Sequence, residues 1–407
     1  MSCLLHPPSA LAIGIAMGII FSVRAFCGRS KQKYLRMLGI YLVLAPLFVF
    51  ETYMAVKKPP ELGRMVSYKE ALEMPEFSRD GGRFKMVPFW KPSEEIRVFA
   101  FQAFNSSLHK APSFFENHTV EIVVFLAVLL VIFGMVRRKP SFRLECVAFL
   151  VAIFITYFCA RLFAFYLFVP QRYIQIPMTV FFVASFPLAV WSVFRGKTDQ
   201  RGSLTQYMGL VFLGVIVAVG SGSGLYGDAN FNKVRTQKGH LWNWVRKYTP
   251  KNALIAGHPT HIDGVMLFGE RRGYATTETA HPFYDKYYAK IKKRLEISLK
   301  AHYARSLKEL ALILKPEGVD YFIFKRKNFY PEALKKSRYF RPLDVLVREL
   351  TSRRYTDYAY KQLPRKVDME NAPYMPYRDD QSVVVDMRKL YQWLNAQGEK
   401  SSTPSVR

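Results

Sequence analysis

The chain has 407 residues, a formal net charge of +28 and a hydrophobic share of 50%, yet its mean hydropathy is zero. These values are compatible only if two unlike parts are averaged. A basic charge can indicate nucleic-acid binding, but here many cations flank apolar segments, which is typical of a membrane protein. No basic motif of a known nucleic-acid-binding fold is present, so nucleic-acid binding is not expected.

The first part of the chain, residues 1–220, contains long apolar runs. A bilayer core needs about 20 mostly apolar residues per helix. Six stretches reach or approach that length: 9–27, 37–56, 119–136, 144–169, 174–194 and 204–220. We therefore expect a polytopic α-helical membrane domain with about six transmembrane helices, interrupted by an outer loop at 57–118.

The charges beside these runs predict an orientation. Basic connections follow the first, third and fifth runs, at 24–36, 137–143 and 195–201. Positively charged loops stay on the cytoplasmic side of a membrane. The sequence therefore predicts a membrane protein, in contact with membrane lipids, whose C-terminal half is extracytoplasmic.

Charged residues within apolar runs are costly in a bilayer and are functional candidates for that reason. Arg161 lies in the fourth run, Glu51 lies in the second, and Arg172 is expected at the outer headgroup level. The favoured interpretation is structural, with Arg161 in an ion pair or extended to the headgroups. The alternative is a polar cavity in which Arg161 binds an anionic lipid phosphate.

The second part, residues 221–398, predicts a small α/β domain. Short strands are expected at the sequences NALIAG, GYATTE, VDYFIFKRK and QSVVVD. Helices are expected before the first strand, over 282–304, after the Ser306–Glu309 capping pattern, and after the last strand. Strands that alternate with helices indicate a mostly parallel sheet. Residues 399–407 are expected to be a disordered tail.

The sequence HPTHIDG follows the first of these strands, where α/β sheets bind ligands. The favoured interpretation is a strand-to-helix turn whose polar side chains cap backbone groups. A zinc site, a catalytic histidine–carboxylate pair and an anion site stay open as alternatives. No cysteine lies nearby, and no G-x-S-x-G nucleophile motif is present. The candidate ligand-binding residues are His258, His261, Asp263, Arg271, Arg272, Glu278 and His281.

The six apolar runs, the long loop and the α/β tail resemble the carboxyl-terminal part of the GT-C membrane glycosyltransferases. By residue pattern the resemblance covers about 251–324, from NALIAGHPTHIDG to GVDYFIF, and is to the tails of bacterial polytopic proteins related to that superfamily. It implies a location in the bacterial cytoplasmic membrane. The resemblance implies transfer of a sugar from a polyprenyl-phosphate donor on the outer face, with a divalent metal possible in an active enzyme. The family's carboxylate in the first outer loop has no counterpart, because the first connection, 28–36, is basic and predicted to face inward.

No catalytic residue can therefore be assigned from the resemblance, and no resident cofactor is expected. We expect a fragment or a divergent member of a lipid-linked sugar transferase. One alternative is a non-catalytic membrane protein whose outer domain binds a glycan or a protein partner. A transporter is the other alternative, although the sequence shows no internal repeat.

Overall fold

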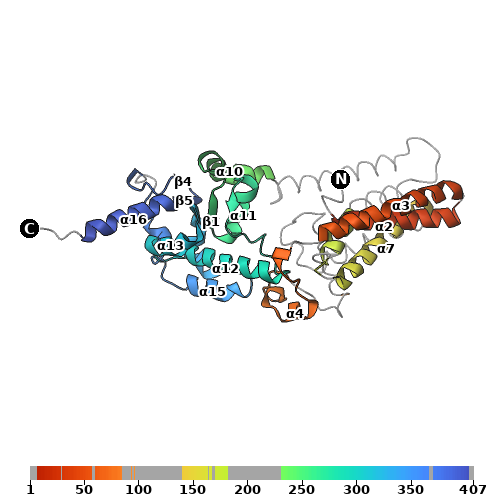
Figure 1. The fold of residues 1–407 in the computed structure, drawn as a ribbon, viewed down its shortest axis with the longest axis horizontal. Helices are drawn as coiled ribbons and strands as arrows, with labels where there is room; N and C mark the ends of the chain where they lie inside the picture. The colour runs from red at the N-terminus through yellow and green to blue at the C-terminus, as the bar shows by residue number, and fades with distance from the viewer. Residues whose placement is uncertain are drawn as a thin grey trace, which may run out of the picture. The chain divides into compact units, whose positions relative to one another are not determined.

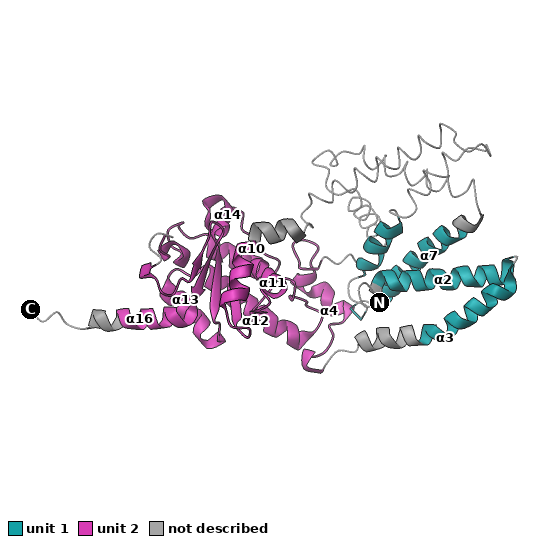
Figure 2. Cartoon of the chain, turned by 90° about the horizontal axis from the view of Figure 1, so that it is seen from above, with its two compact units in different colours: residues 1–58, 87–230 teal, residues 59–86, 231–407 magenta. Residues whose placement is uncertain are grey.

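The computed structural model describes residues 7–28, 30–56, 60–84, 93, 96, 140–163, 165–166, 170–181, 231–365 and 370–402. Two compact units divide the chain (Figure 2). Unit 1 holds residues 1–58 and 87–230, and unit 2 holds residues 59–86 and 231–407. Residues 59–86 were expected within the outer loop of the membrane domain, but the structure places them with the C-terminal unit.

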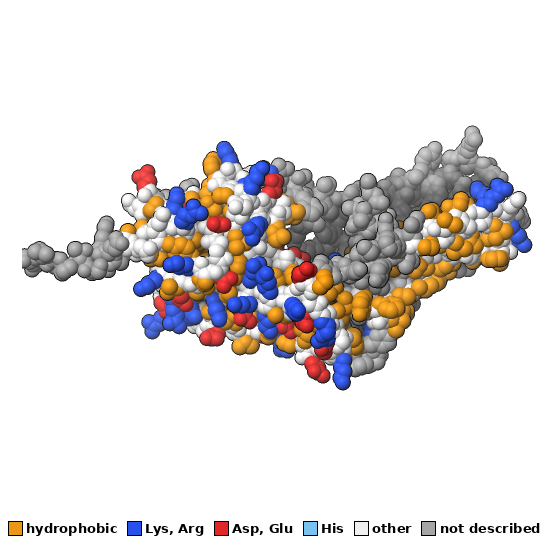
Figure 3. Space-filling model, in the orientation of Figure 1, with side chains coloured by type: hydrophobic (Ala, Val, Ile, Leu, Met, Phe, Trp, Pro, Cys, Tyr) orange, Lys and Arg blue, Asp and Glu red, His pale blue; other side chains and the backbone are white. Residues whose placement is uncertain are grey.

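The described part of unit 1 is helical. Helix α2 (Pro7–Cys27) packs against α3 (Lys31–Val56) and against α7 (Pro140–Leu162). The Tyr41 hydroxyl donates to the Gly14 carbonyl at 2.8 Å, and Arg24 pairs with Glu145 at 2.6 Å. Large apolar side chains remain exposed on all three helices (Figure 3), among them Ile13, Met17, Phe26, Ile40, Val43, Val147, Phe158 and Leu162.

The predicted domain of about six transmembrane helices is wrong. Within the described residues, two helices are long and apolar enough to cross a membrane, Pro8–Cys27 and Leu144–Leu162. The chain is instead a mixed helical fold with a small five-stranded sheet. Within the described residues, these helices correspond to the first and the fourth of the six predicted runs, whereas α3, which covers the second run and contains Pro46, is not among them. The runs 119–136 and 204–220 and most of 174–194 lie outside the described residues.

Unit 2 is built around a mixed sheet (Figure 1) with the strand order β2-β1-β3-β5-β4. Its strands are β1 (Leu254–Gly257), β2 (Arg272–Gly273), β3 (Tyr321–Lys325), β4 (Tyr377–Arg378) and β5 (Ser382–Asp386). Strand β1 is parallel to β2 and β3, whereas β5 is antiparallel to β3 and β4. The expected strands occur at NALIAG, VDYFIF and VVVD, but the expectation of a mostly parallel sheet is wrong.

The predicted strand GYATTE is short because Thr276, within it, and Thr279, directly after it, bond each other's backbone groups. Strand β2 ends at Gly273, before the threonines. The Thr276 hydroxyl oxygen accepts from the amide of Thr279, and the Thr279 hydroxyl donates to the carbonyl of Thr276, both at 3.1 Å. Hydroxyl side chains that bond neighbouring backbone groups in this way compete with the sheet ladder.

Alternate residues of the central strands face opposite cores, as the period of a strand requires. Phe322, Phe324 and Val385 belong to the larger core, which lies against α12 (Asp285–His302), α13 (Leu307–Leu314) and α16 (Met387–Ser402). Ile323 and Val384 belong to the smaller core, which lies against α10 (Phe231–Tyr248) and α11 (Pro259–Phe268). Helices therefore cover both faces of the sheet.

Two sequence predictions concern the ends of helices in unit 2. The predicted capping pattern is present at α13, where Ser306 Oγ accepts from the Glu309 amide at 3.1 Å and Glu309 Oε2 accepts from the Arg305 amide at 2.7 Å. Helix α16 extends to Ser402, so the expected disordered tail begins within a helix; residues 403–407 lie outside the described residues.

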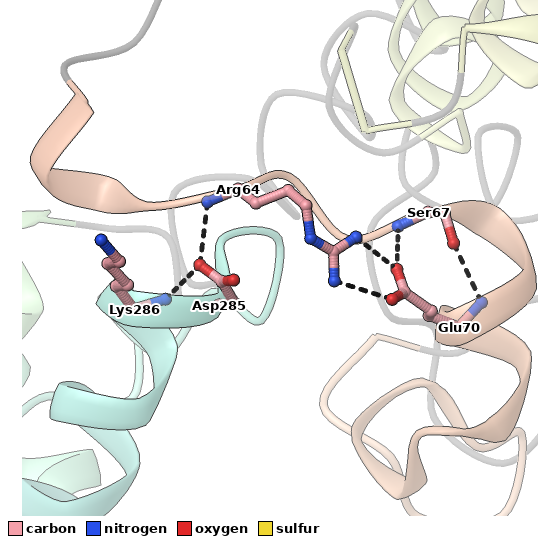
Figure 4. A network of polar contacts seen from close by, with 5 residues as sticks. All are labelled: Arg64, Ser67, Glu70, Asp285 and Lys286. Carbon is pink, nitrogen blue, oxygen red and sulfur yellow. Dashed lines mark hydrogen bonds and ion pairs between the residues drawn. The ribbon is translucent and has the colours of Figure 1, made fainter.

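A polar network fixes residues 60–73 to the start of α12 (Figure 4). Asp285 accepts from the amides of Arg64 and Lys286, at 2.9 and 2.6 Å. Arg64 binds both carboxylate oxygens of Glu70, at 2.9 and 2.7 Å. These hydrogen bonds, together with those from Ser67, lower the pKa of Glu70 to about 2. The network brings α4 (Tyr68–Glu73) and the residues after it to the sheet unit.

Candidate functional site

The candidate site lies at the carboxyl ends of the parallel strands. From β1 the chain passes through α11 to β2 on one side, whereas β3 pairs with β1 on the other side. Where the connections that follow two adjacent parallel strands run to opposite sides, a crevice forms at the carboxyl ends of those strands. Ligands of α/β sheets bind in this crevice. His258 follows β1 directly, and Lys325 ends β3.

The inner layer of this region is a buried pair of histidines. The rings of His258 and His302 lie 5.0 Å apart, centroid to centroid, and both side chains are buried. His258 Nδ1 lies 2.7 Å from the Thr260 hydroxyl. His302 Nε2 accepts from the side-chain amide of Asn328 at 3.2 Å, since an amide nitrogen can only donate. The contact with Asn328 therefore places His302 as a neutral ring, whereas the Thr260 hydroxyl can either donate to His258 or accept from it.

The pKa values of the two histidines favour neutral rings. Burial, with a smaller contribution from the charge of Lys325, lowers the pKa of His258 to about 4. Burial also holds the pKa of His302 well below its ordinary value, with smaller contributions from His258, His261 and Lys325. A buried imidazole loses the hydration that its cation needs, so the neutral form is favoured.

His258 and His261 contact different groups, which argues against a shared metal ion. The His258 ring contacts Tyr303 and Tyr339, at centroid distances of 6.2 and 6.0 Å. The His261 ring instead contacts Trp242 at 5.5 Å, and its Nε2 lies 3.4 Å from the Ser382 hydroxyl. Across the described residues, no three His, Cys, Asp or Glu side chains form a group that could hold a metal ion.

The outer layer is a partly exposed cluster of polar side chains, which we call the edge cluster. Its members are Asp263, Thr277, Glu278, Tyr339 and Arg83. Asp263 Oδ1 accepts from the amide of Glu278 at 3.1 Å, and the Tyr339 hydroxyl lies 3.0 Å from that of Thr277. Arg83 donates to the Thr277 carbonyl at 3.3 Å and pairs with Glu278 at 3.7 Å.

The charged side chains of the edge cluster differ in how far they are exposed to solvent. Burial raises the pKa of Asp263; the hydrogen bond from the Glu278 amide lowers it, and the Glu278 carboxylate raises it. Glu278 itself is 73% exposed, whereas Arg83 is 21% exposed. The arrangement places a half-buried carboxylate, a guanidinium, hydroxyls and an aromatic ring within one small region. Such a set can bind a polar organic molecule through hydrogen bonds of both directions.

Three other predicted residues lie elsewhere in unit 2. Arg271 is buried and its guanidinium donates to backbone carbonyls at the ends of α10 and α11, which explains it as a structural residue. Arg272 is exposed on β2. His281 stacks on Phe283 at a ring distance of 5.9 Å and contacts Phe84 at 5.5 Å.

Of the candidates in unit 1, the side chains of Arg161 and Arg172 are described. Arg161 is buried, donates to the Tyr157 hydroxyl at 3.0 Å and lies over its ring at 5.7 Å. Arg172 is exposed. The side chain of Glu51 lies outside the described residues.

Sequence reasoning missed His302, Tyr339 and Arg83. His302 ends a helix, Tyr339 lies in a segment without a periodic pattern, and Arg83 comes from residues 59–86. The one local signal was the turn SRDGGRF around Arg83, which marks a compact segment and carries no indication of its contacts.

No protein family model matches this sequence, and a search of curated proteins finds none similar to it. The resemblance to the GT-C glycosyltransferases therefore stays a prediction.

Proposed function

We propose that unit 2 binds a glycan, or the sugar of a lipid-linked donor, at the edge cluster. The observation that supports the proposal is the meeting of Asp263, Arg83 and Tyr339 at the carboxyl ends of parallel strands. A carboxylate can accept hydrogen bonds from two sugar hydroxyls, and a guanidinium can donate to a ring or hydroxyl oxygen. The Tyr339 ring adds an apolar face with a polar tip.

The buried histidines support the edge cluster from beneath. The ring of His258 lies edge-on to the rings of Tyr339 and Tyr303, at interplanar angles of 83° and 85°. Side chains that are locked by packing keep a binding site in one geometry, which lowers the entropy lost when a ligand binds. In this proposal His258 positions Tyr339 and does not touch the ligand.

Replacing Asp263 by asparagine is expected to weaken glycan binding about tenfold, because the lost hydrogen bonds involve a charged acceptor. The full chain in detergent is first screened on a glycan array, and the best ligand is then measured by calorimetry. Asp380, an exposed residue in the turn between β4 and β5, gives the matched control Asp380→Asn. Equal affinities of the Asp263→Asn and wild-type chains, or no glycan binding by the wild type, would refute the proposal.

We also propose that the chain is membrane-associated and that unit 2 is extracytoplasmic. The exposed apolar side chains of α2 and α7 and the basic connection at 24–36 support this. Transfer of a sugar from a polyprenyl-phosphate donor rests on the resemblance alone. This transfer stays a prediction, and its test is whether the Asp263→Asn chain loses turnover.

Protease added to intact bacterial spheroplasts is expected to remove unit 2. A cysteine introduced at exposed Ser352 should react with an impermeant maleimide from outside, whereas one at Ser30 should react only after lysis. Labelling of Ser30 but not of Ser352 in intact cells would contradict the orientation.

A further inference from the structure

A groove on unit 2 lies apart from the edge cluster, between α14 (Pro331–Lys336) and α15 (Leu343–Thr351). Its volume is about 400 Å³. It is lined by Pro331, Leu334, Lys335, Arg338, Arg348, Thr351, Ser352, Arg353 and Tyr355. A volume of this size accommodates a small organic molecule.

The charge of the groove has a single sign. Four of the nine lining residues are Lys or Arg, and none is Asp or Glu. Arg348 has a nearby carboxylate, Asp344, at 3.3 Å, but this is an exposed pair within one helix and is worth little. Like charges that meet in a concave surface repel one another and raise the local concentration of anions.

Two of the guanidinium groups are held by the backbone. Arg338 Nη1 donates to the carbonyls of Ser337 and Lys335, at 2.7 and 3.2 Å. Arg353 Nη1 donates to the carbonyl of Tyr303 at 3.0 Å. Each of these bonds involves one nitrogen, whereas a guanidinium carries five N–H donors in a planar fork that matches phosphate oxygens.

We propose that this groove binds a phosphate monoester. Arg338, Arg353 and Lys335 would hold the phosphate oxygens through charge-assisted hydrogen bonds. The apolar side chains of Pro331 and Leu334 would contact the organic part. The phosphate is carried either by a small soluble molecule or by a lipid headgroup. No residue that lines the groove belongs to the edge cluster, so this proposal does not rest on the proposed function.

Calorimetry with the full chain in detergent at low salt tests the proposal, with inorganic phosphate and glycerol phosphate as soluble probes. A second arm measures flotation with phosphatidylcholine vesicles that contain phosphatidic acid. The double variant Lys335→Gln/Arg338→Gln is expected to bind at least about tenfold more weakly, since two charged donors are lost. The matched control Arg388→Gln/Lys389→Gln removes two exposed cations from α16.

Binding of the soluble probes, lost in the groove variant and kept in the control, supports a soluble ligand. Binding only to vesicles with phosphatidic acid, with the same dependence on the groove, supports a lipid headgroup. No binding in either arm, or equal loss in both double variants, overturns the proposal. A further measurement on the wild-type chain does not depend on whether a variant folds. Phenylglyoxal modifies arginine, and the modification of Arg338 is measured by peptide mass spectrometry. Glycerol phosphate, or the vesicles if the ligand is a lipid headgroup, should protect Arg338.

Discussion

Replacing Arg271 by methionine is expected to lower the free energy of unfolding of unit 2 by about 3–5 kcal/mol. The buried guanidinium donates to the carbonyls of Arg246 and Thr249 at the end of α10, at 2.6 and 2.8 Å. It also donates to the Glu270 carbonyl at 3.0 Å. The last carbonyls of a helix have no partner within the helix, so the substitution leaves buried acceptors unsatisfied.

The backbone at Glu270 adds to this effect. Its φ of 51° lies in the left-handed region, which costs free energy in a residue other than glycine. The hydrogen bond from Arg271 to its carbonyl helps to hold that conformation. We therefore expect the ends of α10 and α11 to separate when the guanidinium is removed.

Urea unfolding of the full chain in detergent measures the change, and hydrogen exchange at the amides of β1 and β3 assigns it to unit 2. Arg272 is the adjacent, exposed residue, so Arg272→Met is the matched control and should change the stability by less than about 0.5 kcal/mol. If the two variants were equally stable, Arg271 would not be a structural residue.

Acid is expected to destabilise unit 2 through His258. The pKa of this buried ring is lowered from 6.5 to about 4 in the folded chain. Between these two values the unfolded chain binds more protons than the folded chain, so stability falls as the pH falls from about 6.5 to about 4. Above that range the contribution is constant. A shift of this size corresponds to about 3 kcal/mol, and His302 acts in the same direction.

The measurement compares the free energy of unfolding at about pH 7.5 and about pH 4.5. His258→Asn should reduce the difference between the two pH values, because the titrating ring is gone, although the variant is less stable at both. His240, exposed on α10, gives the control His240→Asn, which should keep the wild-type difference. An unchanged pH difference in His258→Asn would show that other groups cause the acid effect.

The candidate site could be only half predicted from the sequence. The position of HPTHID at the carboxyl end of a strand was correct, because a short apolar run followed by proline marks that boundary locally. Of the polar side chains expected to cap backbone groups, Asp263 accepts from the Glu278 amide. His258 makes no such cap and contacts the Thr260 hydroxyl instead. His302, Tyr339 and Arg83 could not be found, because each reaches the site through contacts between segments distant in the chain.

Local patterns also account for which fold predictions were correct. The amphipathic repeat predicted a helix over 282–304, and α12 spans Asp285–His302. The predicted capping pattern at Ser306 begins α13. In contrast, the number of transmembrane helices was overestimated, since within the described residues two helices are long and apolar enough to cross a membrane.

The sequence by itself determined the short-range features of this protein: the apolar helices, the strands at β1, β3 and β5, and the turn that carries His258. Their causes are periodicity, caps and turn residues, which act within a few positions. Only the tertiary structure decided the antiparallel half of the sheet and the packing of residues 60–84 against the rest of unit 2. It also decided which side chains lie beside Asp263 and His258. Those features depend on long-range packing and on burial, which also sets the neutral state of the histidines.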